Sequence, residues 1–265
     1  MVIRIAMWSG PRNISTAMMR AWGSRADTAV VDEPFYAAYL VSTGLEHPMR
    51  DQVIASQQTD WQAVARQCAG EEVAKDTGPD DKAAVTGGAK IIYQKHMAQH
   101  MIADAPLGWM AKIRHAFLIR PPSEVAASFS AKWEGVRARD LGFARQAELF
   151  DHVRELTGAI PPVIEARTVL ENPRALLSAL CSALRVPFDP AMLSWEPGPR
   201  ASDGIWGAHW YEAVNKSTGF APPPAPASGE LPAALQRIVD ECEPFYQRLA
   251  KFRLEPKAVP GTDLS

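Results

Sequence analysis

The fold of this chain is constrained most by short apolar strands that alternate with helices. Each strand ends in a polar loop. Residues 2–8 are apolar except for Arg4, which predicts a buried strand, and the loop 9–14 leads into a predicted helix over residues 15–24. Further strands are predicted over residues 28–31, 89–94, 115–119 and 162–166. This alternation favours a central parallel sheet with helices on both faces.

The remaining predicted elements complete a single domain over residues 1–265. Helices are predicted over residues 47–69, 123–133, 143–156, 173–184 and 231–252, with Asn172 as the N-cap of the fourth. Residues 71–88 are rich in charges, Gly and Pro, which indicates a surface loop. Residues 197–229 are rich in Gly, Pro, Trp and His and predict a long loop, which in a compact domain is usually functional or disordered.

Composition excludes several classes of protein. The 28 lysines and arginines are balanced by 30 aspartates and glutamates, which argues against a nucleic-acid partner. No apolar run approaches the roughly 18 residues of a membrane span. The three cysteines are far apart and the histidines lack ligand spacing, so we expect neither disulfides nor a metal. A cytoplasmic protein that contacts no membrane is expected, with a homodimer left open as its assembly.

The loop after the first strand is a candidate anion site. It places backbone N–H groups, hydroxyls and one guanidinium beside a helix N-terminus, where phosphate binds well; the residues are Gly10, Pro11, Arg12, Asn13, Ser15 and Thr16. An ordinary N-cap and a surface arginine explain the same residues equally well. The lysine of a Walker A loop is absent, which argues against ATP-dependent phosphoryl transfer.

The end of the fourth predicted strand offers a second cation. Arg120 ends that strand, and Ser128 follows eight residues later in the next helix, so the two can chelate one phosphate. Taken alone, the spacing is weak, because a strand-end arginine more often forms a salt bridge.

These segments, in this order, resemble the sulfotransferases that use 3′-phosphoadenosine 5′-phosphosulfate (PAPS). The loop PRNIST (11–16) is similar to the family's 5′-phosphosulfate loop, and FLIRPPSEVAASFSAKW (117–133) resembles its 3′-phosphate segment. Residues 161–189 resemble the strand, turn and helix that follow in the family. The resemblance implies a three-layer, P-loop NTPase-like α/β fold.

Residue roles follow from that resemblance. It implies that Arg12 and its loop hold the 5′ end of PAPS, that Arg120 and Ser128 hold the 3′-phosphate, and that His96 is the general base. The family's lysine before that histidine is replaced by Gln94, so the neighbouring Lys95 is a further catalytic candidate, although the strand period turns it to the other face.

Two more positions depart from the family pattern. The late basic loop over the 3′-phosphate is not visible, and Lys216 is its candidate replacement. Ile14 stands where the family has glycine, so we expect helical backbone there without a left-handed residue. Residues 198–219 are expected to form a lid that orders on nucleotide binding, with a permanently packed loop as the alternative.

The predicted activity is sulfuryl transfer from PAPS to a hydroxyl or amine of a small molecule, leaving adenosine 3′,5′-bisphosphate. The acceptor pocket is expected to have aromatic walls, although the same side chains could be core residues; the candidates are Glu33, Phe35, Tyr36, Trp206 and His209. Two alternatives stay open: a kinase-like nucleotide phosphotransferase, and a non-catalytic nucleotide-binding module of the same fold.

Overall fold

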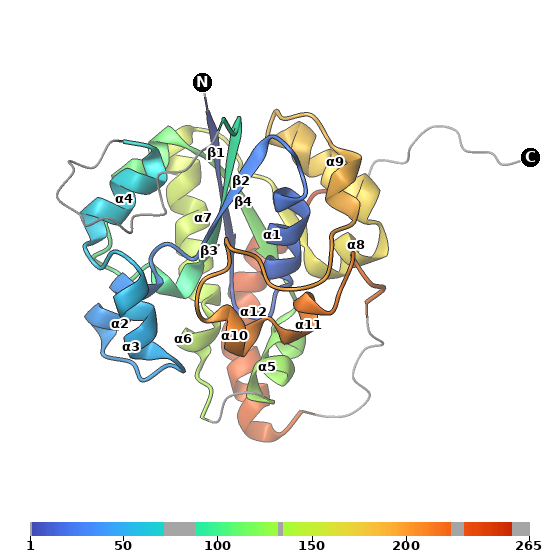
Figure 1. The fold of residues 1–265 in the computed structure, drawn as a ribbon. Coiled ribbons are helices and arrows are strands. Elements are labelled where there is room, and N and C mark those ends of the chain that lie inside the picture. Colours follow the sequence, from blue (N-terminus) through green and yellow to red (C-terminus); the bar gives the residue numbers. More distant parts are fainter. Residues whose placement is uncertain (1, 72–87, 132–134, 224–230, 256–265) are drawn as a thin grey trace, which may run out of the picture.

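Five parallel strands form the centre of the computed structural model, which describes residues 2–71, 88–131, 135–223 and 231–255 (Figure 1). The strands are β1 (Ile3–Ser9), β2 (Thr28–Asp32), β3 (Ile91–Met97), β4 (Arg114–Ile119) and β5 (Val163–Glu165). Their order in the sheet is β2-β3-β1-β4-β5. The predicted α/β class with a parallel sheet is confirmed.

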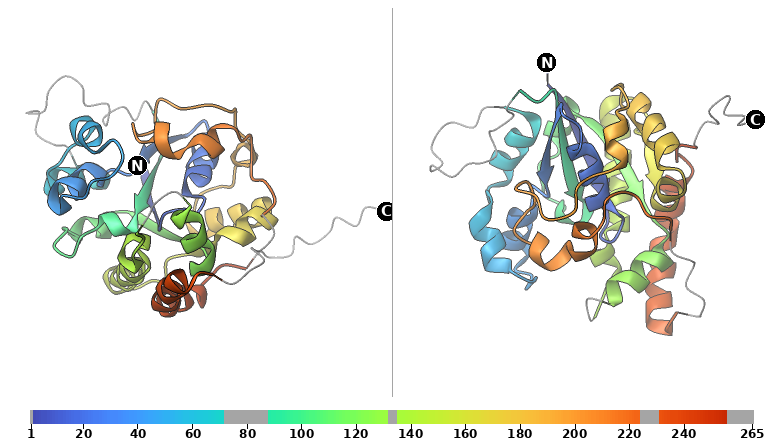
Figure 2. Two further views of the ribbon diagram at one scale, coloured as in Figure 1. Left: turned by 90° about the horizontal axis from the view of Figure 1, so that it is seen from below. Right: turned by 45° about the vertical axis from the view of Figure 1, so that its right-hand side comes forward.

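Helices cover both faces of the sheet and make three layers (Figure 2). Helices α1 (Ser15–Gly23) and α9 (Pro173–Ala183) pack on one face, and α7 (Phe143–Thr157) and α12 (Ala233–Ala250) pack on the other. Side chains of β1 alternate between the two cores: Ile5 and Met7 face α1, whereas Ala6 and Trp8 face α7.

Shorter helices gather around the carboxyl ends of the strands, at the lower end in Figure 1. Among them are α2 (Tyr36–Thr43), α3 (Arg50–Ser56), α5 (Pro122–Ser130), α6 (Ala138–Leu141), α10 (Gly207–Trp210) and α11 (Glu212–Asn215). The other elements are α4 (Trp61–Ala69), α8 (Ala166–Glu171) and the 3₁₀ helices η2 (Ala98–His100), η3 (Gly108–Lys112) and η4 (Pro190–Leu193). This edge of a parallel sheet is where ligands bind.

The helix predicted over residues 47–69 is wrong as a continuous element. It is two helices, α3 and α4, and Asp60 caps the second by accepting a 2.7 Å hydrogen bond from Ala63 N. Helix α2 was not predicted from the sequence. The predicted N-cap of α9 is confirmed, because Asn172 Oδ1 accepts a 3.2 Å hydrogen bond from Ala175 N.

Strand β3 is longer than predicted, and it carries two of the predicted site residues. It continues through Met97, so Lys95 and His96 lie inside the strand and project to opposite faces. Most of the loop predicted over residues 71–88 falls outside the described residues.

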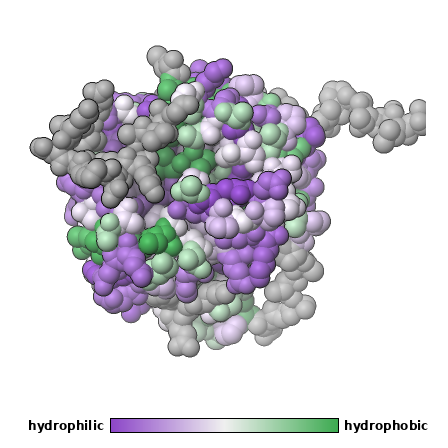
Figure 3. Space-filling model, in the orientation of Figure 1, coloured by the Kyte–Doolittle hydropathy of each residue, from purple (hydrophilic) through white to green (hydrophobic). Residues whose placement is uncertain are grey.

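The segment 197–223 is packed and contains the short helices α10 and α11. Trp206 and Tyr211 are 1% and 4% exposed, and Arg20 Nη2 donates to Asp203 Oδ2 at 2.8 Å. The expected ordering of residues 198–219 on nucleotide binding stays a prediction. On the face in Figure 3, hydrophobic residues form small patches among hydrophilic ones. No helix among the described residues is long and apolar enough to cross a membrane.

Candidate functional site

A cavity of about 610 Å³ opens at the carboxyl ends of β1, β2, β3 and β4. Its walls come from the β1–α1 loop and from α2, α5, α10 and α11. Most of the predicted site residues line it: Pro11, Arg12, Asn13, Ser15, Thr16, Glu33, Tyr36, Lys95, Arg120, Ser128 and Trp206. The packing of the strands therefore brings together residues that are up to 195 positions apart in the chain.

The β1–α1 loop contains two left-handed residues. Arg12 has φ 60° and Ile14 has φ 54°. The expectation of helical backbone at Ile14 is therefore wrong, although a β-branched side chain opposes this conformation by about 1–2 kcal/mol. Strain of this kind persists where the surrounding structure imposes the backbone path, commonly at binding sites.

Gly10 and Asn13 hold the β1–α1 loop against neighbouring backbone. Gly10 does not line the cavity, and a Cβ at this position would lie 2.6 Å from the carbonyl oxygen of Leu141, so a larger residue cannot fit without a shift. Asn13 Nδ2 donates to the Leu118 carbonyl at 3.3 Å, and its buried Oδ1 has no hydrogen-bond partner. Gly10 therefore acts through packing, whereas Asn13 ties the loop to β4.

The residues predicted to bind the two ends of the donor meet at one place in the structure. Arg12 Nε donates to Ser128 Oγ at 3.0 Å, and Arg120 Nη1 donates to the Arg12 carbonyl at 2.7 Å. Burial lowers the pKa of the Arg12 guanidinium, and the charge of Arg120 adds to this effect. Arg120 also pairs with Glu124 at 2.9 Å. Arg12 therefore presents a partly buried cation with no carboxylate partner among the described residues.

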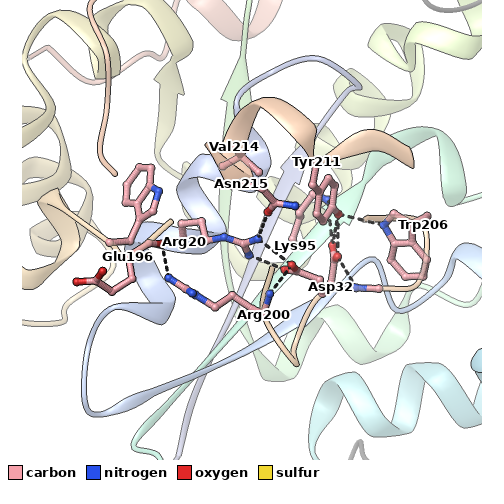
Figure 4. A network of polar contacts seen from close by, with 12 residues as sticks. Arg20, Asp32, Lys95, Glu196, Arg200, Trp206, Tyr211, Val214 and Asn215 are labelled. Atoms are coloured by element: carbon pink, nitrogen blue, oxygen red, sulfur yellow. Dashed lines mark hydrogen bonds and ion pairs between the residues drawn. The ribbon is translucent and has the colours of Figure 1, made fainter. Parts of the chain in front are cut away.

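A buried ionic cluster lies between β2, β3 and α10–α11 (Figure 4). Lys95 Nζ lies 2.9 Å from Asp32 Oδ1 and 2.5 Å from Glu33 Oε1. The Tyr211 hydroxyl accepts from Lys95 and from Trp206 Nε1, and it donates to Asp32. One ammonium thus faces two carboxylates in a site nearly closed to solvent.

Burial and the unequal numbers of positive and negative charges shift the pKa values of the residues in this cluster. Burial raises the pKa of Glu33, the Lys95 ammonium opposes that rise, and the Asp32 carboxylate adds to it, so that the pKa stays above its ordinary value. Burial by itself lowers the pKa of Lys95, but Asp32 and Glu33 outweigh burial and raise it. Glu33 also lines the cavity. The cavity wall therefore includes a carboxylate whose proton affinity is higher than usual.

His96 does not line the cavity, in contrast to its predicted role as general base. Its ring stacks on Trp8 at a centroid distance of 4.4 Å, and Nε2 lies 3.0 Å from Gln94 Oε1. Burial, followed by the charge of His115, lowers the pKa of His96 to about 3. The strand period directs Lys95 to the cavity and His96 to the hydrophobic core behind it, so the geometry does not support His96 as the base.

Three more predicted residues lie outside the cavity. Lys216 is exposed, and its Nζ bonds Glu212 at 2.8 Å. His209 is exposed beside Trp210. Phe35 packs in the core, with its ring centroid 5.4 Å from that of Trp61. These positions do not support the predicted phosphate contact of Lys216 or the predicted acceptor contacts of His209 and Phe35.

Three residues of the site have roles that were not predicted from the sequence. Asp32 was visible as the first of two acidic residues at the end of a strand, Tyr211 was visible only as one of several aromatic residues in the long loop, and His100 carries no local signal. Tyr211 reaches Lys95 across 116 positions of the chain. Among the described residues, no group of three or more His, Cys, Asp or Glu could hold a metal ion.

Residues 3–253 match the family model described as a sulfotransferase domain. The chain belongs to the sulfotransferase domain family. It is 33% identical over 247 residues to branched-chain-amino-acid aminotransferase-like protein 2 of Arabidopsis thaliana, and 35% identical over 219 residues to protein 1 of the same name. These matches cover 92% and 83% of this chain but only 41% and 37% of the relatives. The sulfotransferase-like chain thus spans about two fifths of their length.

Solved structures support the same fold. The sulfotransferase domain of the Synechococcus olefin synthase superposes with a TM-score of 0.56 at 16% identity, covering 96% of both chains. A sulfotransferase from Alicyclobacillus acidocaldarius superposes with a TM-score of 0.51 at 13% identity, covering 96% of this chain and 98% of that one. The predicted family resemblance and the P-loop-like sulfotransferase fold are confirmed.

Proposed function

We propose that this chain transfers a sulfuryl group from PAPS to a hydroxyl or amine of a small molecule. One observation carries the proposal: a single cavity joins the partly buried cation of Arg12, beside the N-terminus of α1, to the carboxylate of Glu33. The first group suits an anionic donor, and the second suits proton removal from an acceptor.

The donor end of the cavity consists of the β1–α1 loop with Arg12, Arg120 and Ser128. The orphaned Asn13 Oδ1, the hydroxyls of Ser15 and Thr16 and the free N–H groups of the helix supply further polar atoms there. These residues fit an adenosine bisphosphate, and each charge-assisted hydrogen bond to it is worth about 1.5–3 kcal/mol. When bound, PAPS supplies the sulfuryl group and a phosphate leaving group.

The acceptor end of the cavity consists of Glu33, Tyr36, Tyr39, His100 and Trp206. Glu33 accepts the proton of the acceptor, a role worth about 10²–10⁴ in rate. Lys95, held by Glu33 and Asp32, offers positive charge to the equatorial oxygens of the transferring group. The aromatic side chains exclude water and favour an acceptor with an apolar body.

Calorimetric titration of the full chain tests the proposed donor. Adenosine 3′,5′-bisphosphate is expected to bind about ten-fold more tightly than 5′-AMP, because the second phosphate gains a charge-assisted contact. Arg12→Ala is expected to weaken that binding by about ten-fold or more, whereas Arg66→Ala, an exposed arginine of α4 outside the cavity, is the matched control.

Three results would count against the proposal. Preferential binding of ATP would favour the kinase-like alternative. Tight binding of the bisphosphate without transfer from PAPS to any hydroxyl or amine would favour the non-catalytic module. Equal affinity for the bisphosphate and 5′-AMP would remove the PAPS assignment.

A further inference from the structure

Two polar atoms face each other at the acceptor end of the cavity without a hydrogen bond between them. His100 Nδ1 lies 3.9 Å from Glu33 Oε2, and both residues line the cavity. His100 is 4% exposed, and its buried Nδ1 has no hydrogen-bond partner. Buried polar atoms in native proteins nearly always have a partner, so an unpaired nitrogen on a residue that lines a cavity points to a ligand atom.

Stacking fixes the orientation of His100. Its ring stacks on Tyr36 at a centroid distance of 4.5 Å with an interplanar angle of 8°, and on Tyr39 at 4.8 Å. Both tyrosines belong to α2, which begins three residues after Glu33 in the chain. Burial lowers the pKa of His100 well below its ordinary value, so the imidazole is neutral and each ring nitrogen either donates or accepts.

The gap between the two atoms has the right size for one further oxygen or nitrogen atom. A distance of 3.9 Å is too long for a direct hydrogen bond. An oxygen or nitrogen placed about 2.8 Å from each atom completes both hydrogen bonds and subtends an angle of roughly 90°. That angle is about 20° narrower than the tetrahedral angle between the hydrogen and lone-pair directions of a hydroxyl or an amine, a deviation that hydrogen bonds tolerate.

We infer that Glu33 Oε2 and His100 Nδ1 together hold the nucleophilic atom of the acceptor, which makes His100 a second catalytic residue. This inference rests on the proposed function and extends it to a residue that the sequence did not indicate. His100 directs the lone pair of the nucleophile, and Glu33 receives its proton.

The atoms of the step balance with these two residues. The lone pair of the acceptor oxygen or nitrogen forms the new bond to sulfur, and its proton moves to Glu33 Oε2. The S–O bond to the leaving phosphate breaks, and its electron pair stays on the phosphate oxygen. His100 keeps its proton count throughout, because it only donates or accepts one hydrogen bond.

The tautomer of His100 separates the two classes of acceptor. A hydroxyl donates its single proton to Glu33 and can accept from a protonated Nδ1, whereas an amine can donate one N–H to Glu33 and a second to an unprotonated Nδ1. The probes are 2-phenylethanol and 2-phenylethylamine, which differ only in the nucleophilic atom and suit an aromatic-walled cavity.

Two substitutions at His100 distinguish binding of the nucleophilic atom from simple packing. His100→Phe keeps a ring between the tyrosines but removes the nitrogen, whereas His100→Asn loses the ring but places an amide atom near the position of Nδ1. With [³⁵S]PAPS and whichever probe is accepted, we expect His100→Phe to lower kcat by about ten-fold or more. His100→Asn should retain more activity than His100→Phe, and both variants should bind adenosine 3′,5′-bisphosphate like the wild type. The reverse order of activities would overturn the inference and leave His100 as a packing residue.

A crystal structure of the wild type with adenosine 3′,5′-bisphosphate gives a test that needs no acceptor. We expect an ordered water within about 3.2 Å of both Glu33 Oε2 and His100 Nδ1. A direct hydrogen bond between Glu33 and His100, or the absence of any ordered atom between them, would overturn the inference. Loss of bisphosphate binding in the wild type would instead contradict the proposed donor, so the two failures are distinguishable.

Discussion

Arg12 Nε donates a 3.0 Å hydrogen bond to Ser128 Oγ, which links the first loop of the chain to helix α5 across 116 positions. The sequence resemblance assigns these residues to opposite ends of the donor, but the structure brings them into direct contact. Arg120 strengthens the link because it donates to the carbonyl of Arg12. The donor end therefore behaves as one connected unit.

This connection predicts that losses of affinity at Arg12 and Ser128 are not additive. Arg12→Ala and Ser128→Ala should each weaken binding of adenosine 3′,5′-bisphosphate, and the double variant should lose less than the sum of the two, with a coupling energy of at least about 0.5 kcal/mol. Calorimetric titration of the four proteins measures the coupling. Ser130→Ala is the matched control, because Ser130 Oγ donates to the Ala127 carbonyl of the same helix. Strict additivity would contradict the prediction.

The raised pKa of Glu33 predicts the acid limb of the pH–rate profile. Glu33 must be deprotonated to accept a proton, so turnover should fall as the pH decreases through a value above that of an ordinary carboxylate. Glu33→Gln should lower turnover by about 10²-fold or more and leave affinity for the bisphosphate nearly unchanged. Full turnover in the Gln variant would assign the base elsewhere. Glu148→Gln, on the exposed surface of α7, is the control.

Tyr211 connects Lys95, Asp32 and Trp206 through one hydroxyl, and its removal should destabilise the fold. In Tyr211→Phe, buried polar groups lose their partner, which costs about 1–3 kcal/mol of unfolding free energy. Tyr246→Phe removes a hydroxyl that donates a 3.1 Å hydrogen bond to Glu165 Oε1, and it should cost only about 0.5–1.5 kcal/mol. Urea unfolding measures both values, and equal losses would show that the cluster does not depend on Tyr211.

Buried neutral histidines predict loss of stability in mild acid. Burial and nearby charge lower the pKa of His96 to about 3, and burial lowers that of His115 to about 4, against 6.5 for an ordinary histidine. The unfolded chain therefore binds more protons than the folded chain between these values, so stability is complete above pH 6.5 and falls as the pH decreases. Each imidazole contributes a loss of roughly 2 kcal/mol between pH 6.5 and 5.

Urea unfolding at several pH values tests this linkage. His96→Asn should reduce the pH dependence as well as the stability, and it should leave affinity for the bisphosphate within a few-fold. A wild type whose stability does not change between pH 7 and 5 would contradict the buried neutral state of both histidines.

Several features of the fold could be predicted because they depend on local patterns. The apolar strands, the helices α1, α7, α9 and α12 and the N-cap Asn172 each follow from a few neighbouring residues. The ends of elements were less accurate. Strand β3 continues three residues beyond the prediction, and the face of the strand that meets the cavity carries Lys95 rather than His96, the reverse of what the resemblance implied.

By itself, the sequence determined the alternation of strands and helices, the loop that carries Arg12 and the edge of the sheet where the cavity lies. Only the tertiary structure decided that Lys95 rather than His96 faces the cavity, that Tyr211 completes its ionic cluster and that His100 lies near Glu33. Local patterns reflect the backbone and the burial of one face. Contacts between residues far apart depend on how packed layers bring their side chains together, which no short stretch of sequence encodes.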